Sequence, residues 1–194
     1  MALVFLSLLV LFVGASAQVP GFGTCPEVPV QQDFQPDKYT GIWYEYERYF
    51  AIFEAFGRCT YANYTLKPNG RINVVNTLTN SLTGSTNAAH GEAYAPDSSS
   101  PSKLVVQFDQ SPVPGPYWVL ETDYDHYTII YSCSNITTSI IPTKAEIIWI
   151  LSRDRAGPGA ELVEHAEALI ERLGLRVRYL MKIDQTNCPS IEHH

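Results

Sequence analysis

The sequence predicts an all-β fold: an eight-stranded antiparallel up-and-down barrel with one C-terminal α-helix packed on the outside. Short runs rich in Val, Ile, Thr, Tyr and Phe follow one another, separated by hairpin-length breaks of Gly, Pro, Asn, Asp and Ser. About eight such strands is the number at which an antiparallel sheet closes around one small ligand. A single helical pattern then follows the last run, which gives the barrel its one external helix.

Eight segments are the expected strands, at 41–48, 59–66, 71–78, 86–95, 103–110, 117–122, 127–133 and 145–152. The clearest hairpin turn is Lys67-Pro68-Asn69-Gly70, between the second and third strands. In the fifth strand Leu104, Val106 and Phe108 share one face, while the other face is largely polar, so one face is buried and the other meets water. By contrast, 147–151 is apolar on both faces and needs a cover on its outer side.

The expected cover is a helix over 160–173, after the Pro158-Gly159 break. Its apolar residues recur at helical spacing, at Leu162, Val163, Ala166, Leu169, Ile170 and Leu173. Gly174 ends the helix. His165 falls on the polar face and is expected to be solvated, and 175–183 resumes an extended pattern.

Residues 1–17 form an uninterrupted apolar stretch that ends in Ala15-Ser16-Ala17, the small-residue pattern of a cleavage site. They predict a secretory signal peptide, followed by a single domain over 18–194, and therefore a secreted, extracellular protein. A short membrane anchor is the alternative interpretation of this stretch, and no later stretch is long and apolar enough for a transmembrane anchor. The formal net charge is −7. With no run of Lys or Arg, it excludes nucleic acid as a partner and argues against a polyanionic membrane surface.

The cysteines are Cys25, Cys59, Cys133 and Cys188. In an exported chain they predict two structural disulfides, for which three pairings are possible. None belongs to a CxxC pair or lies near a histidine at zinc-ligand spacing, so we expect no metal site. Asn63-Tyr64-Thr65 and Asn135-Ile136-Thr137 fit the N-glycosylation pattern, which makes Asn63 and Asn135 candidate glycan sites.

Three widely separated motifs carry a family resemblance. They occur in the order Gly41-Ile42-Trp43, Thr122-Asp123-Tyr124 and Trp149-Ile150-Leu151-Ser152-Arg153, within a secreted, strand-rich chain that ends in one helix. Together they resemble the motifs of the lipocalin family, and shorter matches across the chain resemble its apolipoprotein D group, which includes invertebrate members. The resemblance implies a structural pair in which Trp43 plugs the barrel floor and Arg153 lies across its indole. Asp123 is expected to bond to nearby backbone amides, with Thr122 and Tyr124 beside it in a turn.

The resemblance also implies the disulfide pairing, Cys25 with Cys133 and Cys59 with Cys188, which leaves no free thiol. By similarity to the apolipoprotein D group, Tyr64, Asn76 and Trp149 face a ligand cavity. Strand parity adds Phe108 and Tyr117 as wall residues. The implied ligand is a small, mostly apolar molecule such as a steroid, retinoid, bilin, carotenoid, fatty acid or other lipid. We therefore expect a carrier that has no catalytic residue and needs no cofactor beyond such a ligand.

Other functions stay open at this point. A pigment-binding protein for a bilin or carotenoid is one, and a ligand for a cell-surface receptor is another. A lipocalin-type isomerase needs a free cysteine or an activated histidine, and the chain has neither G-x-S-x-G nor H-E-x-x-H. We expect a monomer or a weak homo-oligomer. The polar, proline-rich segment 109–115 disfavours lipoprotein or membrane association, although 51–56 is an alternative apolar patch.

Overall fold

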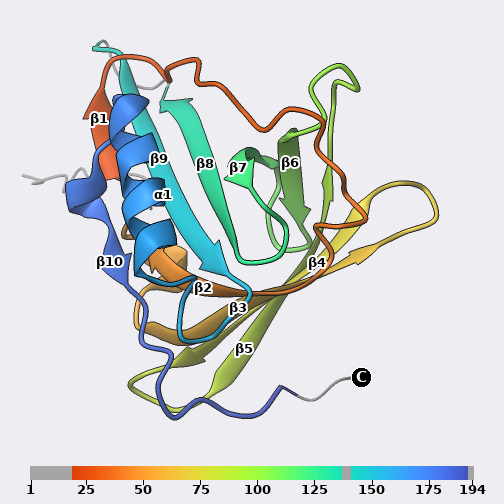
Figure 1. The fold of residues 1–194 in the computed structure, drawn as a ribbon, viewed down its shortest axis with the longest axis vertical. Coiled ribbons are helices and arrows are strands. Elements are labelled where there is room, and N and C mark those ends of the chain that lie inside the picture. Colours follow the sequence, from red (N-terminus) through yellow and green to blue (C-terminus); the bar gives the residue numbers. More distant parts are fainter. Residues whose placement is uncertain (1–18, 137–140, 192–194) are drawn as a thin grey trace, which may run out of the picture.

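The computed structural model describes residues 19–136 and 141–191. Its centre is a closed barrel of eight antiparallel strands in which each strand pairs with the next along the chain and β9 pairs back to β2 (Figure 1). The strands are β2 (Gly41–Arg48), β3 (Gly57–Leu66), β4 (Ile72–Asn80), β5 (Thr86–Tyr94), β6 (Lys103–Phe108), β7 (Gly115–Thr122), β8 (Tyr127–Ile136) and β9 (Thr143–Ser152). The predicted all-β barrel is confirmed. The proposed signal peptide at 1–17 lies outside the described residues.

Two short strands extend the sheet beyond the barrel. β1 (Val19–Phe22) pairs with the first half of β9, and β10 (Met181–Lys182) pairs with the end of β2. β1 was not predicted, because a strand of four residues is too short to show an alternating pattern. β10 falls within the extended pattern expected over 175–183. The extended pattern expected over 175–183 is wrong in part, since the 3-10 helix η2 (Val177–Tyr179) interrupts it.

The helix α1 (Ala160–Arg172) lies outside the barrel, over β8 and β9. Ala166 and Ile170 of the helix are buried in one cluster with Ile148 and Ile150 of β9. This confirms why β9 is apolar on both faces. His165 is exposed, as its place on the polar face predicted, and its Nε2 also lies 2.5 Å from the Glu121 carboxylate on β7.

Both disulfides tie a terminal arm to the barrel, Cys25–Cys133 to β8 and Cys59–Cys188 to β3. They are the pairs that the family resemblance implied, and they leave none of the four cysteines free. Because they close loops of more than a hundred residues, they restrict the unfolded chain strongly.

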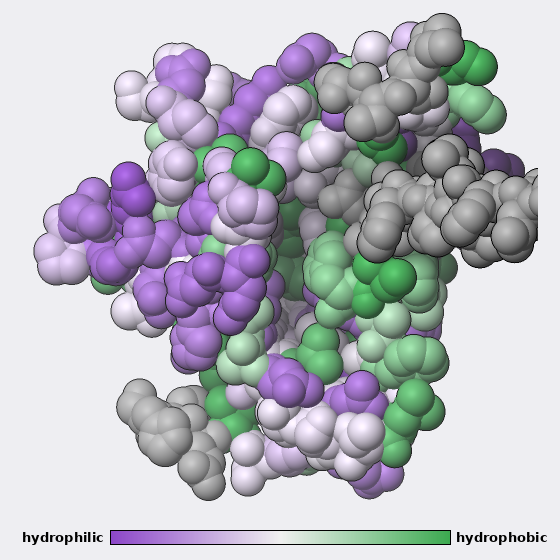
Figure 2. Space-filling model, turned by 180° about the vertical axis from the view of Figure 1, so that it is seen from behind, coloured by the Kyte–Doolittle hydropathy of each residue, from purple (hydrophilic) through white to green (hydrophobic). Residues whose placement is uncertain are grey.

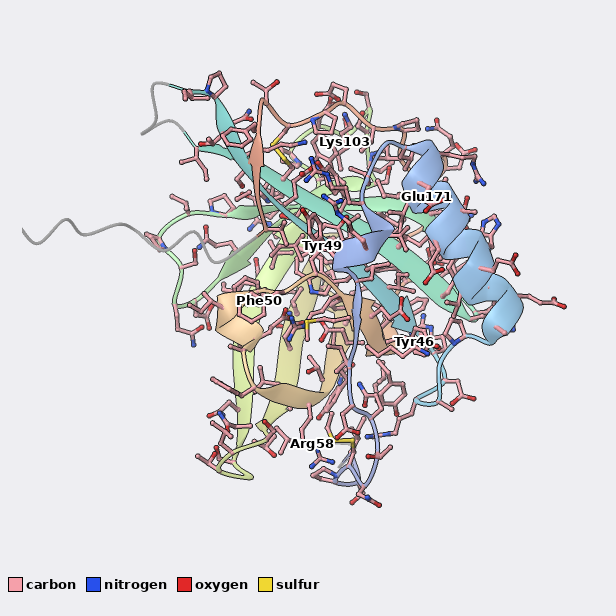
Figure 3. The ribbon with its side chains drawn as sticks, turned by 90° about the vertical axis from the view of Figure 1, so that its left-hand side faces the viewer. Tyr46, Tyr49, Phe50, Arg58, Lys103 and Glu171 are labelled. Atoms are coloured by element: carbon pink, nitrogen blue, oxygen red, sulfur yellow. A yellow bond between two sulfur atoms is a disulfide. The ribbon has the colours of Figure 1, made fainter. Side chains whose placement is uncertain are left out.

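The connection between β2 and β3 contains a second 3-10 helix, η1 (Ile52–Glu54). Seen from behind, hydrophobic side chains gather on the side of the molecule that carries η1 and β10, at the right of the view (Figure 2). A quarter turn from the first view shows η1 and η2 both facing the viewer, with Tyr49 between them and α1 beyond η2 (Figure 3). No helix among the described residues is long and apolar enough to cross a bilayer.

Candidate ligand-binding site

One end of the barrel, which we call the base, is sealed by Trp43. Its side chain is fully buried, and the Arg153 guanidinium lies 3.7 Å from the centre of the indole ring. The same guanidinium donates hydrogen bonds to the backbone carbonyls of Tyr124, Ile42 and Lys38 at 2.9 to 3.1 Å. Gly41 leaves room for it, since a Cβ at this position would lie 3.2 Å from Arg153 Nη1. The pair therefore has the structural geometry that the motifs suggested.

The turn between β7 and β8 closes the same end. The Asp123 carboxylate accepts hydrogen bonds from the backbone amides of His126 and Tyr127, at 2.8 and 3.0 Å. Burial opposes ionisation of Asp123, yet these bonds outweigh it and lower the pKa of the carboxyl. The Thr122 hydroxyl donates to the Tyr127 carbonyl and accepts from the Tyr124 amide. Asp123 is thus fully used in holding the turn.

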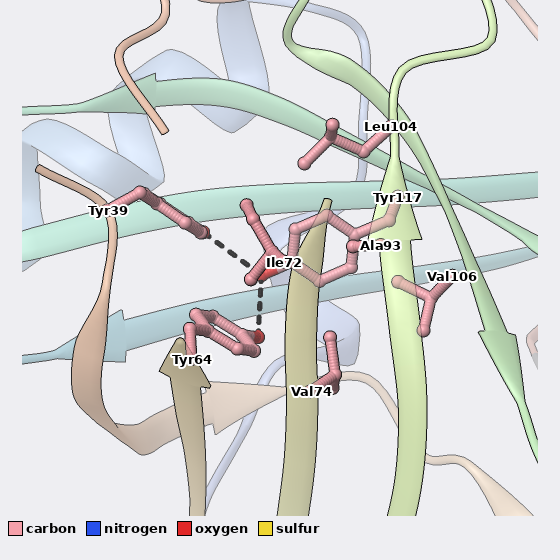
Figure 4. Close-up of a pocket in the computed structure, with 8 residues that line it drawn as sticks. All are labelled: Tyr39, Tyr64, Ile72, Val74, Ala93, Leu104, Val106 and Tyr117. Carbon is pink, nitrogen blue, oxygen red and sulfur yellow. Dashed lines mark hydrogen bonds between the residues drawn. The ribbon is translucent and has the colours of Figure 1, made fainter. Parts of the chain in front are cut away.

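Three tyrosines meet inside the barrel above Trp43. The Tyr117 hydroxyl lies 2.9 Å from that of Tyr64 and 3.0 Å from that of Tyr39, and the Tyr39 hydroxyl also meets Thr128 (Figure 4). The Tyr39 and Tyr64 rings stack with centroids 5.6 Å apart. Burial raises the pKa of Tyr39 to about 12 and raises those of Tyr64 and Tyr117 as well. All three phenols are therefore neutral at physiological pH.

The space around these tyrosines is almost filled. Their neighbours are apolar side chains of β4, β5 and β6, namely Ile72, Val74, Ala93, Leu104 and Val106. The remaining cavity measures about 10 Å³, which holds about one water molecule. A larger guest therefore has to lie farther from the base, or the tyrosine side chains have to move.

The opposite end, which we call the mouth, carries the connection from β2 to β3 and the one from β4 to β5, because strands in an up-and-down barrel alternate in direction. Asn76 follows Ile72 and Val74 along the inward face of β4, toward the mouth, and pairs with Ala62 of β3. Phe108 and Trp149 are half-buried and pack against the same interior cluster. Their assignment to a ligand pocket stays a prediction.

Two polar atoms in this part of the barrel are buried without a hydrogen-bond partner among the described residues, Asn76 Oδ1 and Thr60 Oγ1. A buried acceptor or hydroxyl left unpaired costs about 1 to 3 kcal/mol. A bound molecule or a water that supplies a donor would remove that cost. This half of the interior is therefore suited to a guest with one or two polar atoms.

A buried charged cluster lies beside it, and sequence reasoning did not predict it. Arg48 Nε is 3.2 Å from the Glu45 carboxylate and 3.3 Å from that of Glu54, and all three side chains are buried. Trp149 Nε1 donates to Glu54 at 3.4 Å. Burial raises the pKa values of Glu45 and Glu54, and the nearby guanidinium only partly offsets this. A bulge between Glu45 and Glu47 shifts the strand parity, so that Glu45 and Arg48 meet on one side.

The remaining candidate residues are on the outside. Asn63 and Asn135 are both exposed, and Asn135 Oδ1 accepts a hydrogen bond from the Cys25 amide. Thr137, which completes the second glycosylation pattern, lies outside the described residues. Within 19–136 and 141–191, no group of His, Cys, Asp and Glu is placed to hold a metal ion.

The structure has the features of a small-molecule-binding β-barrel. It is a closed antiparallel barrel with a sealed base, unpaired polar atoms in its interior and one helix outside. A family model described as a lipocalin-like domain matches residues 34–185. The chain belongs to the lipocalin family.

The chain is similar to individual relatives over most of its length. The chain is 41% identical to apolipoprotein D of Cavia porcellus over 190 residues, 97% of each protein. It is 30% identical to the bilin-binding protein of Pieris brassicae over 157 residues, 80% of each. Among solved structures, apocrustacyanin C1 is similar with a TM-score of 0.76 and 22% identity, over 88% of this chain and 93% of that one, which supports the fold alone.

Proposed function

We propose that the protein is a carrier that holds one small, mostly apolar molecule in the mouth half of the barrel. The observation that carries the proposal is the unpartnered Asn76 Oδ1, a buried acceptor within an interior that is otherwise largely apolar. Trp149 and Phe108 supply apolar wall, and the Tyr64 and Tyr117 hydroxyls form the floor of the site. Burial then supplies most of the affinity, and one or two hydrogen bonds orient the guest.

The relatives support this function. The chain resembles apolipoprotein D over nearly its whole length, and another relative is named for the bilin it binds. A pigment is thus one candidate guest, beside steroids, retinoids and fatty acids. A bilin or carotenoid would be recognised by its visible absorption.

Binding without chemistry fits the side chains available. The cysteines are all in disulfides, so the thiol nucleophile of a cysteine-dependent isomerase has no candidate. His90 is exposed, while His126 pairs with Asp123 and His165 with Glu121 on the outside of the barrel. These contacts of the described residues support a carrier that uses no catalytic residue and no cofactor other than its guest.

Secretion is part of the same proposal. It is supported by the apolar N-terminal stretch with its cleavage pattern and by two disulfides, which persist in oxidising compartments. We expect removal of residues 1–17, a single domain over 18–194, and glycans on Asn63 and Asn135. A cell-surface receptor and a weak homo-oligomer are compatible with an extracellular carrier.

The test is solvent extraction of the protein purified from its native secretion, followed by mass and absorption spectra of the extract. We expect one abundant apolar molecule, which must rebind to the emptied protein and bind more weakly to Asn76→Leu. Leu66→Ala, an exposed change near the base, is the matched control. An empty extract, together with no binding of steroid, retinoid, bilin or fatty acid probes, would contradict the carrier function.

A further inference from the structure

The connection between β2 and β3 presents four large apolar side chains to solvent. Phe50, Ile52, Phe53 and Phe56 are 52% to 63% exposed, and we call them the mouth patch. Glu54 is the only charged residue within 49–57, and it is buried against Arg48. Contiguous exposed apolar side chains of this kind mark interaction surfaces.

The neighbouring hairpin between β4 and β5 continues this uncharged surface. The Ser81 amide donates a hydrogen bond to the Phe56 carbonyl at 2.8 Å, which joins the two connections. Residues 80–87 contain no ionisable side chain, and Leu82 among them is 73% exposed. The mouth therefore offers a broad apolar rim in a chain whose net charge is −7.

The exposure of the mouth patch is imposed by the fold. Arg48 donates hydrogen bonds to the backbone carbonyls of Tyr49 and Glu54, at 3.0 and 2.8 Å, and so fixes both sides of the patch. With its backbone held in this way, the connection directs Phe50, Ile52 and Phe53 outward rather than into the barrel. An apolar surface held outward by its backbone is suited to contact a partner.

A row of cations runs beside the mouth patch. β10 pairs with the end of β2 in a register that sets Met181 against Arg48. The Tyr49 hydroxyl donates to the Arg176 carbonyl at 2.7 Å and accepts from its amide at 2.9 Å. Figure 3 shows η2 lying at Tyr49, with Phe50 on the side away from α1. We call the exposed side chains of Arg176, Arg178 and Lys182 the basic strip.

The charge of the basic strip is not neutralised by an acidic partner. Residues 173–183 hold these three cations and no acidic residue, and among the described residues none of the three forms an ion pair. Their contacts are with tyrosines: Arg176 and Arg178 donate to the Tyr179 hydroxyl at 3.2 and 3.1 Å, and the Lys182 ammonium lies 5.2 Å from the centre of the Tyr46 ring. Glu171 lies on α1, on the other side of η2 from Phe50 (Figure 3). Positive charge and exposed rings thus share one side of the molecule.

We infer that this surface docks the protein on a membrane that contains anionic phospholipid. Aromatic and aliphatic side chains of the mouth patch enter the headgroup region, and the basic strip contacts lipid phosphates beside them. The docked mouth brings Trp149, which bonds to Glu54 at the root of the mouth patch, close to the lipid. An apolar guest can then pass between bilayer and barrel without crossing bulk water.

The test is flotation of the mature protein with vesicles of phosphatidylcholine alone or mixed with phosphatidylserine. We expect binding to the mixed vesicles, and weaker binding in high salt because exposed charges are screened. Charge reversal by Arg176→Glu, Arg178→Glu and Lys182→Glu together should weaken it at least about tenfold. Phe53→Ser with Phe56→Ser should weaken binding to a similar extent.

Two control changes near the base, Lys38→Glu and Leu66→Ser, should leave vesicle binding unchanged, since both residues are exposed away from the mouth. All the changed side chains are exposed, and thermal unfolding will verify that each variant folds. Absence of binding to the mixed vesicles, or equal binding by every variant, would overturn the inference. Self-association that Phe53→Ser abolishes, without vesicle binding, would overturn it in favour of a second copy of the chain.

Discussion

The base and the mouth of the barrel are built on different principles. At the base, Trp43, Arg153, Asp123 and Tyr39 have partners for their polar groups, and the remaining cavity is about 10 Å³. Toward the mouth, Asn76 Oδ1 and Thr60 Oγ1 are buried without a partner among the described residues, two carboxyls share one guanidinium, and large apolar side chains face solvent. The base therefore has the features of a stable core. The mouth keeps unpaired polar atoms and exposed apolar side chains, which a guest and a partner surface can contact.

The largest effect expected from breaking the base is that of Trp43→Ala. The change removes a fully buried indole and the platform for Arg153, so it should lower the free energy of unfolding by about 3 to 5 kcal/mol. Urea denaturation measures this value. Trp118→Ala is the matched control, because Trp118 is only half-buried on the outer wall and should cost less. If both variants lost the same free energy of unfolding, the base would be no more important for stability than the outer wall.

At the mouth, Arg48→Met should lower the free energy of unfolding by about 3 kcal/mol at neutral pH, because it leaves Glu45 and Glu54 buried without a cation. The raised pKa values of both carboxyls mean that the folded state favours their protonated forms. Stability is therefore retained at pH values below the ordinary glutamate pKa and is lost as pH rises through the raised pKa values.

Denaturation of Arg48→Met across this pH range tests the sign: the variant should recover stability on acidification. Adding Glu45→Gln and Glu54→Gln should remove most of this pH dependence, since no buried carboxyl then remains in the cluster. A loss for Arg48→Met that does not change with pH would show that packing, rather than buried charge, is responsible.

Trp149→Ala sharpens the comparison from the side of function. Removing one aromatic wall of the proposed site should weaken the binding of progesterone or palmitate by more than about 1 kcal/mol, or about five- to tenfold, with the fold intact. Isothermal titration measures the affinity, and Trp118→Ala again serves as the control. Unchanged affinity in Trp149→Ala would place the ligand elsewhere.

The smallest effect is expected for Asp123→Ala, which removes the acceptor that holds the β7–β8 turn and should cost about 1 kcal/mol at neutral pH. The lowered pKa of this carboxyl means that its contribution is present above the ordinary aspartate pKa and fades as pH falls through the lowered value. The variant and the parent chain should therefore converge in acid. Asp109→Ala, in the exposed β6–β7 connection, should show neither the loss nor the convergence.

The sequence predicted the regular parts of the molecule because its patterns are local. Alternation and turn residues placed the eight strands of the barrel within a few residues, and the apolar faces of β9 and α1 predicted each other. The lipocalin motifs supplied the Trp43 and Arg153 pair, and the wider family resemblance supplied both disulfide pairings, which no periodicity could provide. β1 was not predicted because it is short, and the pairing of β1 and β10 depends on residues distant in the sequence.

The mouth was harder to predict because it depends on one β-bulge and on how charged and apolar side chains are distributed over the surface. The bulge in β2 brings Arg48 to the side of Glu45, and simple alternation misses it. Tyr39 lies before the first barrel strand, so strand parity did not assign it to the tyrosine cluster. The net charge of −7 argued against an anionic membrane, yet an average over the chain hides three cations beside four exposed apolar side chains.

The most direct test of the central claim, that the guest lies in the mouth half above a rigid base, is a titration followed by the three indole N–H signals in a nitrogen-15 NMR spectrum. Trp43 lies at the base, Trp118 on the outer wall and Trp149 beside the proposed site. We expect progesterone or palmitate to shift the Trp149 signal and to leave the Trp43 and Trp118 signals in place. A bound ligand that shifts Trp43 while Trp149 stays unchanged would contradict the account.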